Sequence, residues 1–419
     1  MQDFEQDQSF SIADTPDEVQ NKSPMEKMRA VVTDGVSYIE DAMPRFIEDL
    51  QTLCLIDSPS DNKAGLDAMA QQLADMLHHV GMQTRTVEHV RGNAIVGALE
   101  GDAPTAPAIL LIGHHDTVHP VGSAQARTHL EGEKFYGPGT VDMKAGLLQG
   151  IYALEILQHQ GYKDFNKIIF LSVPDEEISQ RYHVGLIKEL TRKRPHVIGL
   201  EGASAVGTVV IRRKGCMHYR LTAEGQAAHA GSSPKRGRNA VLELAHQIVQ
   251  ANSFAGWREG FTINAGPIHG GSRANIVSDF AEILFDTRFL QPEDRIATEE
   301  RWQELLQQQL VSGVKLTLLA EPDSMVPMVA SAESLTMAHY VQMISEDILH
   351  KPYEPETRGG ASDCCNTAAA GCPTIDGLGA IGGGAHTSHE FALLPPVPDR
   401  TALLAGLIVA ISERHTHSV

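Results

Sequence analysis

The positions of apolar residues predict two helices at the start of the chain. A capping box at residues 23–26, with proline at the first helical position, begins one helix, and Pro44 is expected to interrupt it before it resumes toward Cys54. Between residues 66 and 80 apolar side chains return every three or four positions, and Gly81 follows as a stop signal. The pattern at residues 66–80 therefore predicts an amphipathic helix.

Farther along, continuous apolar runs alternate with helical stretches. The runs that predict buried strands are residues 108–112, 168–173 and 197–200. The helical stretches between them are residues 143–157 and 184–190. Strands and helices in alternation are typical of a mixed, mostly parallel sheet covered by helices, so we expect an α/β domain here.

From about Gly215 the order of elements changes to β-α-β-β-α-β. The expected strands are near residues 217–223, 261–265, 280–289 and 314–319, and the expected helices near residues 239–250 and 293–310. This order indicates a small α+β module of the ferredoxin-like, split-βαβ type. Helical patterns then resume near Ala330. The simplest organisation is one discontinuous α/β domain, residues 1–213 and 325–419, interrupted by an inserted domain, residues 214–324.

Composition narrows the class of protein. The 419 residues carry 53 acidic against 34 basic side chains, a net charge of -19, which disfavours nucleic acid and anionic lipid surfaces as partners. No run approaches the roughly 18 apolar residues that cross a bilayer, and the N-terminus lacks the layout of a secretion signal. We therefore expect a cytoplasmic protein with no membrane partner.

Residues 1–22 are expected to form a flexible tail. The five cysteines include no CxxC pair, which disfavours a disulfide framework.

Polar side chains stand where the predicted strands end. His114 and Asp116 follow the run at residues 108–112, and alternate residues of a strand face the same way, so both project together. A histidine nitrogen can bind zinc, and a nearby carboxylate can orient the imidazole. Alone, an H-x-D pair is more often structural.

Two further stretches offer carboxylates. The glycine-rich loop at residues 137–144 delivers Asp142 at a helix start, where it could also be an ordinary helix cap. Asp175, Glu176 and Glu177 follow the second predicted strand. Three adjacent carboxylates repel one another unless a cation lies between them or the turn is fully solvated.

The remaining candidates lie later in the chain. Glu201 follows the third predicted strand, and His386 follows the glycines at residues 382–384, which allow the backbone to approach a site closely. Ligands of open α/β sheets gather at the carboxyl ends of the strands. Because the candidates fall at such ends or in loops beside them, the sequence favours a metal site.

The order of these motifs resembles that of the dizinc metallopeptidases of the glutamate carboxypeptidase type. That superfamily also includes acetylornithine deacetylase, succinyl-diaminopimelate desuccinylase and aminoacylases. The motifs are H-x-D, G-P-G-x-x-D-M-K, D-E-E, a strand-end Glu and G-G-G-A-H-T-x-x-E. The resemblance covers nearly the whole chain after about residue 40 and implies an enzyme that hydrolyses an amide or peptide bond next to an amino acid with a free carboxylate.

The resemblance implies two Zn²⁺ per subunit, with Co²⁺ or Mn²⁺ as substitutes. The expected ligands of one ion are His114, Asp142 and Glu201, and those of the other are Asp142, Glu177 and His386. Asp142 would thus bridge the two ions, and a cis peptide is expected between it and Met143. Asp116 would orient a ligand imidazole, and Glu176 would be the general base.

The resemblance also extends to the inserted module as a lid and dimerisation domain. Residues 225–231 match a G-x-x-x-H-A-G turn, whose His229 is expected to reach the active site of the partner subunit in a homodimer. Asn275 and Arg288 are expected to bind the free carboxylate of the substrate. Gly360, in a G-G-x-S-D loop, is expected to line the substrate site. His229 could instead be a buried turn residue and Arg288 part of a surface ion pair.

Two departures from the family pattern leave the substrate open. Residues 178–183 stand where glycine and small residues are usual, and Ser278 stands where proline is common. Neither change removes a ligand or Glu176. The expected substrate is a peptide or an N-acyl amino acid, so an N-acyl-amino-acid deacylase is the alternative enzyme. A catalytically inactive metal-binding regulatory protein is the alternative from another class, against which the intact Glu176 argues.

Overall fold

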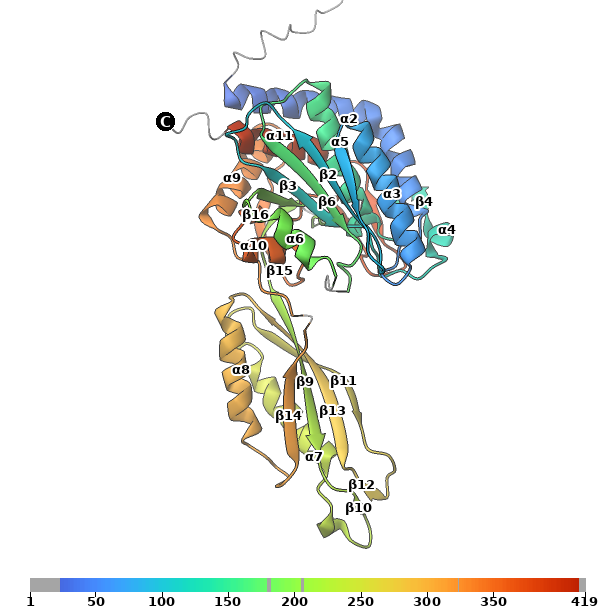
Figure 1. The fold of residues 1–419 in the computed structure, drawn as a ribbon, viewed down its shortest axis with the longest axis vertical. Coiled ribbons are helices and arrows are strands. Elements are labelled where there is room, and N and C mark those ends of the chain that lie inside the picture. Colours follow the sequence, from blue (N-terminus) through green and yellow to red (C-terminus); the bar gives the residue numbers. More distant parts are fainter. Residues whose placement is uncertain (1–22, 179–181, 205–206, 323, 414–419) are drawn as a thin grey trace, which may run out of the picture.

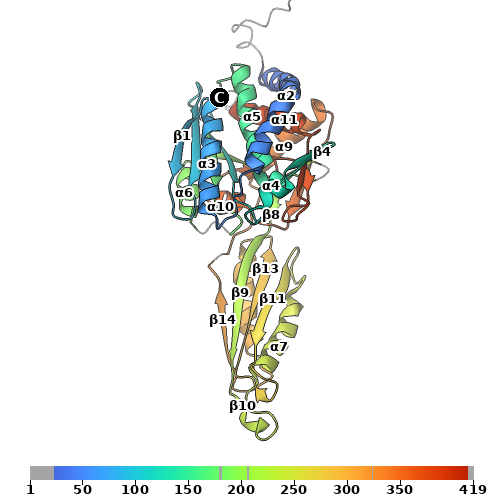
Figure 2. The same cartoon turned by 90° about the vertical axis from the view of Figure 1, so that its right-hand side faces the viewer.

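The chain folds into two lobes that lie end to end (Figures 1 and 2). The structure, a computed structural model, describes residues 23–178, 182–204, 207–322 and 324–413. The predicted tail and the middle of the departure at residues 178–183 lie outside the described residues. Among the helices that are described, none is both long and apolar enough to span a bilayer.

The larger lobe is built on a six-stranded sheet with the order β1-β2-β6-β3-β7-β16. Its strands are β1 (Gln83–Val87), β2 (Ala94–Glu100), β3 (Ile109–His114), β6 (Lys167–Val173), β7 (His196–Gly199) and β16 (Thr374–Ile375). β3 pairs in parallel with β6 and β7, and β16 with β7, whereas β1 and β2 form an antiparallel edge. The predicted mixed, mostly parallel sheet is confirmed.

Helices cover both faces of this sheet. Those on one face are α2 (Pro24–Cys54), α3 (Lys63–His79), α5 (Ala145–His159), α9 (Ala332–Asp347) and α11 (Val397–Glu413). Those on the other face are α6 (Val184–Leu190) and α10 (Asp363–Ala369). Along β3, Ile109 and Leu111 pack into the first core, and Leu110 and Ile112 into the second. Because both faces are buried, residues 109–112 of the strand are all apolar.

Helix α2 corrects one expectation, because it runs unbroken through Pro44. Proline removes one helical hydrogen bond. Phe46 and Leu50, which follow it, are fully buried, and α2 packs along α11. The burial of these side chains outweighs the lost bond, at about 1.5–3 kcal/mol for each large apolar residue. The capping box is present as expected, with the backbone N–H of Glu26 donating to Ser23 Oγ.

The smaller lobe contains the predicted β-α-β-β-α-β order. Its antiparallel sheet has the order β11-β13-β9-β14, and α7 and α8 cover one face. The elements are β9 (Gly215–Glu224), α7 (Ala240–Ala251), β11 (Thr262–Gly270), β13 (Phe280–Phe289), α8 (Glu293–Leu306) and β14 (Lys315–Ala320). A two-stranded sheet of β10 (Ala228–His229) and β12 (Ile276–Val277) lies at the end farthest from the larger lobe (Figures 1 and 2). The domain borders at residues 213/214 and 324/325 stay predictions.

Short strands and helical turns complete the two lobes. A four-stranded sheet consists of β4 (His129–Glu131), β5 (Lys134–Tyr136), β17 (Gly382–Gly383) and β18 (Phe391–Leu393), and a parallel pair of β8 (Thr208–Arg213) and β15 (Glu354–Arg358). The short helical turns are α4 (Ser123–Arg127), η1 (Thr140–Lys144), η2 (Pro234–Arg236) and η3 (Asn252–Phe254), the last two in the smaller lobe. All five cysteines are free thiols and buried.

Candidate metal centre and catalytic site

Three parallel strands bring polar side chains to one edge of the large sheet. His114 is the last residue of β3, Glu177 follows β6, and Glu201 follows β7. His114 is fully buried, and its Nε2 lies 3.7 Å from Glu201 Oε1. The carboxyl ends of parallel strands meet at the same edge, which is why residues far apart in sequence converge here.

Asp142 lies between two imidazoles. Its Oδ1 is 3.1 Å from His114 Nε2, and its Oδ2 is 3.2 Å from His386 Nε2. Glu177 Oε2 is also 3.2 Å from His386 Nε2. The peptide bond from Asp142 to Met143 is cis, as the resemblance implied. The five side chains predicted as ligands therefore form one connected group around a single carboxylate.

Asp116 holds parts of this group in position through hydrogen bonds. It is fully buried, and its two carboxylate oxygens accept the backbone N–H groups of Glu176 and Glu177 at 3.2 and 3.1 Å. The hydroxyl of Ser60 donates to Oδ2 at 2.7 Å, and His114 Nδ1 lies 3.3 Å from Oδ1. One carboxylate thus orients both the imidazole and the loop that carries Glu176 and Glu177.

Glu390 holds the loop around Asp142, a part that the sequence reasoning missed. Its Oε1 accepts the backbone N–H groups of Val141 and Asp142 at 2.9 and 3.0 Å. Its Oε2 accepts the N–H of Gly139 at 2.9 Å and lies 2.6 Å from His119 Nε2. The signal was its place as the last residue of the G-G-G-A-H-T-x-x-E motif.

Asp175 does not join the metal-ligand group, although it adjoins Glu176. Its carboxylate accepts the backbone N–H groups of Tyr182 and His183 and lies 2.9 Å from His183 Nδ1. Only two of the three adjacent carboxylates therefore face the site.

Asp363, at the start of α10, is a second residue that the sequence reasoning missed. Its carboxylate is buried and makes no hydrogen bond to the residues that the structure describes.

The pKa values of the group depart strongly from ordinary ones. Burial raises the pKa of Glu201 to about 8, with a further increase from Asp142, and burial raises that of Glu176 well above its usual range. Hydrogen bonds to Asp142 and Glu177 raise the pKa of His386 to about 10. Burial alone would raise the pKa of Asp142, but the hydrogen bonds with His114 and His386 outweigh it and keep the pKa far below its ordinary value.

This donor set suits divalent transition-metal ions. His114, Asp142 and Glu177 each offer one atom within 4.8 Å of the others, which is close enough to share an ion. Imidazole nitrogens and carboxylate oxygens are ligands that zinc accepts. Several buried carboxylates at one point also need positive charge. The side chains therefore fit a metal centre.

The predicted residues of the smaller lobe are divided between its two ends. β10, which contains His229, lies at the far tip, where the backbone carbonyl of Asn275 accepts the backbone N–H of Ala230 at 2.9 Å. Arg288 lies at the opposite end of β13, paired with Asp286 at 2.6 Å. Ten strand residues span roughly 30 Å. A single chain therefore does not bring Arg288 and Asn275 to one carboxylate.

Gly360 lies in the larger lobe. Its carbonyl accepts a hydrogen bond from Arg213 at 3.1 Å, and a Cβ atom at this position would meet no atom within 4 Å. The residue is exposed, so it can line an open space. Its predicted role in the substrate site stays a prediction.

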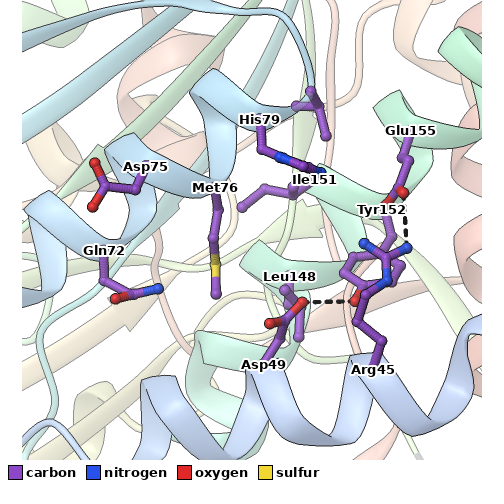
Figure 3. A pocket seen from close by; sticks show the side chains of 11 residues that line it. Arg45, Asp49, Gln72, Asp75, Met76, His79, Leu148, Ile151, Tyr152 and Glu155 are labelled. Atoms are coloured by element: carbon purple, nitrogen blue, oxygen red, sulfur yellow. Dashed lines mark hydrogen bonds and ion pairs between the residues drawn. The ribbon is translucent and has the colours of Figure 1, made fainter.

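A separate cavity of about 300 Å³ lies among α2, α3 and α5 (Figure 3). Four of its polar side chains are paired with one another: Arg45 donates to Glu155, and the hydroxyl of Tyr152 donates to Asp49, both at 2.7 Å. None of its lining residues is a predicted site residue. We therefore assign no part of a reaction to this cavity.

Comparisons with known proteins agree with this geometry. The model of the family described as Peptidase family M20/M25/M40 matches residues 110–410. Carboxypeptidase G2 of Pseudomonas sp. (strain RS-16) is 26% identical over 375 residues, which cover 88% of this chain and 90% of that protein. Succinyl-diaminopimelate desuccinylase of Coxiella burnetii (strain Dugway 5J108-111) is 26% identical over 358 residues, covering 80% and 91%. A tripeptidase from Staphylococcus aureus subsp. aureus mu50 has a similar fold, with a TM-score of 0.75, 22% identity and coverage of 88% and 99%.

Proposed function

This chain belongs to peptidase family M20/M25/M40, and we propose that it removes an acyl or peptidyl group from an amino acid with a free carboxylate, as a glutamate carboxypeptidase does. Members of this family are metal-dependent hydrolases of amide or peptide bonds. The observation that carries the proposal is the Asp142 carboxylate held between His114 and His386, with the carboxylate of Glu176 close enough to raise the pKa of His114.

The residues that would hold two zinc ions are those predicted from the sequence. His114 and Glu201 lie on one side of Asp142, and Glu177 and His386 lie on the other. Two divalent ions so placed supply polarisation of an amide carbonyl and acidification of water. The number of ions and their identity as zinc belong to this proposal.

Glu176 is the proposed general base. Its backbone is fixed by Asp116, and burial raises the pKa of its carboxyl group well above the ordinary value. A carboxylate of raised pKa holds a proton more firmly, which suits a group that accepts a proton from water and passes it to the leaving nitrogen. A protein that only binds metal has no need of such a group, which argues against the regulatory alternative.

A variant of the base tests the proposal directly. We expect Glu176→Gln to keep both metal ions but to lose turnover about 10²–10⁴-fold, because the amide cannot accept the proton. Glu177→Gln is the matched control, since it should lose metal as well as activity. Metal content by elemental analysis and the rate of hydrolysis are the measurements. A Glu176→Gln enzyme with the wild-type rate would show that the base is another group.

A substrate screen separates the two enzymes that the site allows. The zinc-loaded protein should hydrolyse dipeptides with C-terminal glutamate faster than N-acetyl amino acids. The reverse order would identify an N-acyl-amino-acid deacylase, which is the second candidate because the desuccinylase relative covers most of the chain. No hydrolysis of either class by protein with a full metal complement would support the regulatory alternative.

A homodimer through the smaller lobe is part of the proposal. α7 exposes Leu242 and Val249, and the neighbouring edge strand β11 exposes Ile268, with 48%, 73% and 53% of their surfaces accessible. Apolar side chains beside an unpaired strand edge suit contact with a second copy. In such a dimer the tip that carries His229 and Asn275 would complete the site of the partner. The cytoplasmic location stays a prediction.

A further inference from the structure

The smaller lobe contains a second group of metal-binding side chains, separate from the centre described above. Cys216 and His218 lie two residues apart on β9, and Asp286 lies opposite His218 on the neighbouring strand β13. Their donor atoms all lie within 4.8 Å of one another. We propose that Cys216, His218 and Asp286 bind a thiophilic divalent ion, zinc above all, at the end of the smaller lobe nearest the larger one.

The alternation of the strands places all three side chains on one face of the sheet. Met217, Tyr219 and Phe285 point into the core beneath α7 and α8. Their neighbours in sequence therefore point to the opposite face, which these helices leave uncovered. Cys216 is 5% exposed, whereas the side chains of His218 and Asp286 are 22% and 29% exposed. An ion can reach the group from solvent, and water can take the remaining coordination position.

The distances fit an ion in tetrahedral coordination. With Zn–S about 2.3 Å and Zn–N or Zn–O about 2.0–2.1 Å, a tetrahedral angle places sulfur and nitrogen about 3.6 Å apart and nitrogen and oxygen about 3.3 Å apart. In the structure Cys216 Sγ lies 3.6 Å from His218 Nε2, and that nitrogen lies 3.2 Å from Asp286 Oδ2. The sulfur and a carboxylate oxygen of Asp286 lie within 4.8 Å of each other, so a small movement would bring them to the spacing of two zinc ligands.

The same distances argue against a catalytic role and against a simple hydrogen-bonded chain of these residues. A catalytic Cys-His-Asp arrangement needs the carboxylate on the ring nitrogen that the cysteine does not use. Here sulfur and carboxylate both approach Nε2 of His218. One ring nitrogen carries at most one proton, so it cannot donate to both neighbours at once. An ion between the three atoms satisfies all of them together.

Arg288 competes with an ion for the carboxylate of Asp286. Its Nε and Nη2 donate to the two oxygens of Asp286 at 2.7 and 2.6 Å. A thiolate from Cys216 and the carboxylate of Asp286 together neutralise a divalent ion, so Arg288 would face a neutral complex. Binding would draw Asp286 Oδ2 away from Arg288 Nη2. Removal of the arginine should therefore strengthen ion binding, and this expectation does not depend on the proposed function.

Cobalt provides a signal that separates this group from the main centre. The five proposed ligands of the main centre include no sulfur, and among the candidate metal groups of the described residues Cys216 is the one cysteine, so a thiolate-to-cobalt charge-transfer band in the near ultraviolet would report on this group. Wild-type protein stripped of metal by chelation and then titrated with Co²⁺ should develop this band, to an intensity of one thiolate–cobalt site per chain, and added Zn²⁺ should remove it. Cys216→Ser should abolish it and weaken binding of the added ion at least about 100-fold, because a direct ligand is lost. Cys372→Ser, a buried cysteine of the larger lobe whose thiol donates to Thr191, is the matched control and should keep the band.

The competing arginine supplies a second test. Arg288→Gln should bind Co²⁺ about tenfold more tightly than wild type, and Asp286→Asn should bind it at least about tenfold more weakly. Absence of the band in wild type, or its persistence in Cys216→Ser, would overturn the proposal. The band is independent of hydrolysis, so an inactive protein that shows it would count against the proposed reaction and not against this site.

Discussion

At the scale of single residues, the candidate site depends on carboxylates whose partners differ. Asp142 contacts two imidazoles, Asp116 accepts backbone N–H groups, and Asp175 pairs with His183. All three residues are aspartates. Only the groups that each one contacts show whether it is a candidate metal ligand or a structural support. The pKa values follow the same division, because burial raises a carboxyl pKa and hydrogen bonds to the ionised form lower it.

Glu390 should be essential for the position of Asp142. Glu390→Gln replaces an acceptor oxygen by a donor and loses the hydrogen bonds to one pair of donors, which should cost about 2–5 kcal/mol in the free energy of unfolding. Metal affinity should fall about 10–100-fold, because the loop around Asp142 loses its support. Urea unfolding and metal titration measure the two effects.

A second buried glutamate provides the matched control for this variant. Glu243 accepts the backbone N–H groups of Leu310 and Val311 in the smaller lobe. Glu243→Gln should lose stability to a similar extent and keep wild-type metal affinity at the main centre. If both variants lose metal affinity equally, the loss reflects general destabilisation, and the role given to Glu390 is wrong.

Removal of the metal should make stability depend on pH. The pKa of Glu201 is raised to about 8 from 4.5, and that of His386 to about 10 from 6.5. A raised pKa in the folded state contributes stability that is present below the ordinary pKa and is lost as the pH rises through the raised one. The Tm of chelated protein should therefore fall between pH 5 and pH 10, and less so after metal is restored. Glu201→Gln should remove the fall in Tm between about pH 5 and 8. A Tm of the chelated wild type that does not change with pH would contradict the raised pKa values of Glu201 and His386.

At the scale of elements, strand ends and loops place the side chains. β3, β6 and β7 carry their polar residues to one edge because they run parallel. β9 and β13 run antiparallel along the length of the smaller lobe. Arg288 lies at one end of this lobe, and β10, which contains His229, lies at the other. The assignment of a common substrate carboxylate to Arg288 and Asn275 therefore requires two chains.

The position of Arg288 predicts a selective effect on substrates. Arg288→Ala should raise KM about 10–100-fold for substrates with a free carboxylate, because a charge-assisted pair is lost, and should change little for the corresponding methyl esters. Arg220→Ala is the matched control, since Arg220 lies on the same open face of the sheet and pairs with Glu321. Equal losses on acids and esters would show that Arg288 has no part in recognising the carboxylate.

At the scale of the whole molecule, the tip of the smaller lobe lies far from the centre in the larger lobe (Figures 1 and 2). His229 can therefore serve catalysis only through another copy of the chain or a large movement of the lobe. The exposed apolar residues of α7 and β11 favour another copy.

Mixing two inactive variants tests the shared site. His229→Ala and Glu176→Gln should each be inactive alone, and after exchange of subunits an equal mixture should recover about a quarter of wild-type activity. The recovery arises because each mixed dimer contains one site with both residues intact. Two copies of the same variant, mixed in the same way, are the control. No recovery despite demonstrated exchange would exclude a shared site.

The sequence by itself determined the family, the alternation of elements and the identity of the five side chains proposed as ligands of the main centre. These features are local, because periodicity, turn residues and motif spacing are properties of neighbouring residues. It misplaced a break at Pro44, since the burial that keeps α2 continuous comes from contacts with distant helices. Only the tertiary structure decided that Asp175 faces His183, that Glu390 holds the loop around Asp142, and that Cys216, His218 and Asp286 meet across two strands. Each of these is a contact between segments far apart or on different strands, and the distance between such segments depends on packing, which no local pattern records.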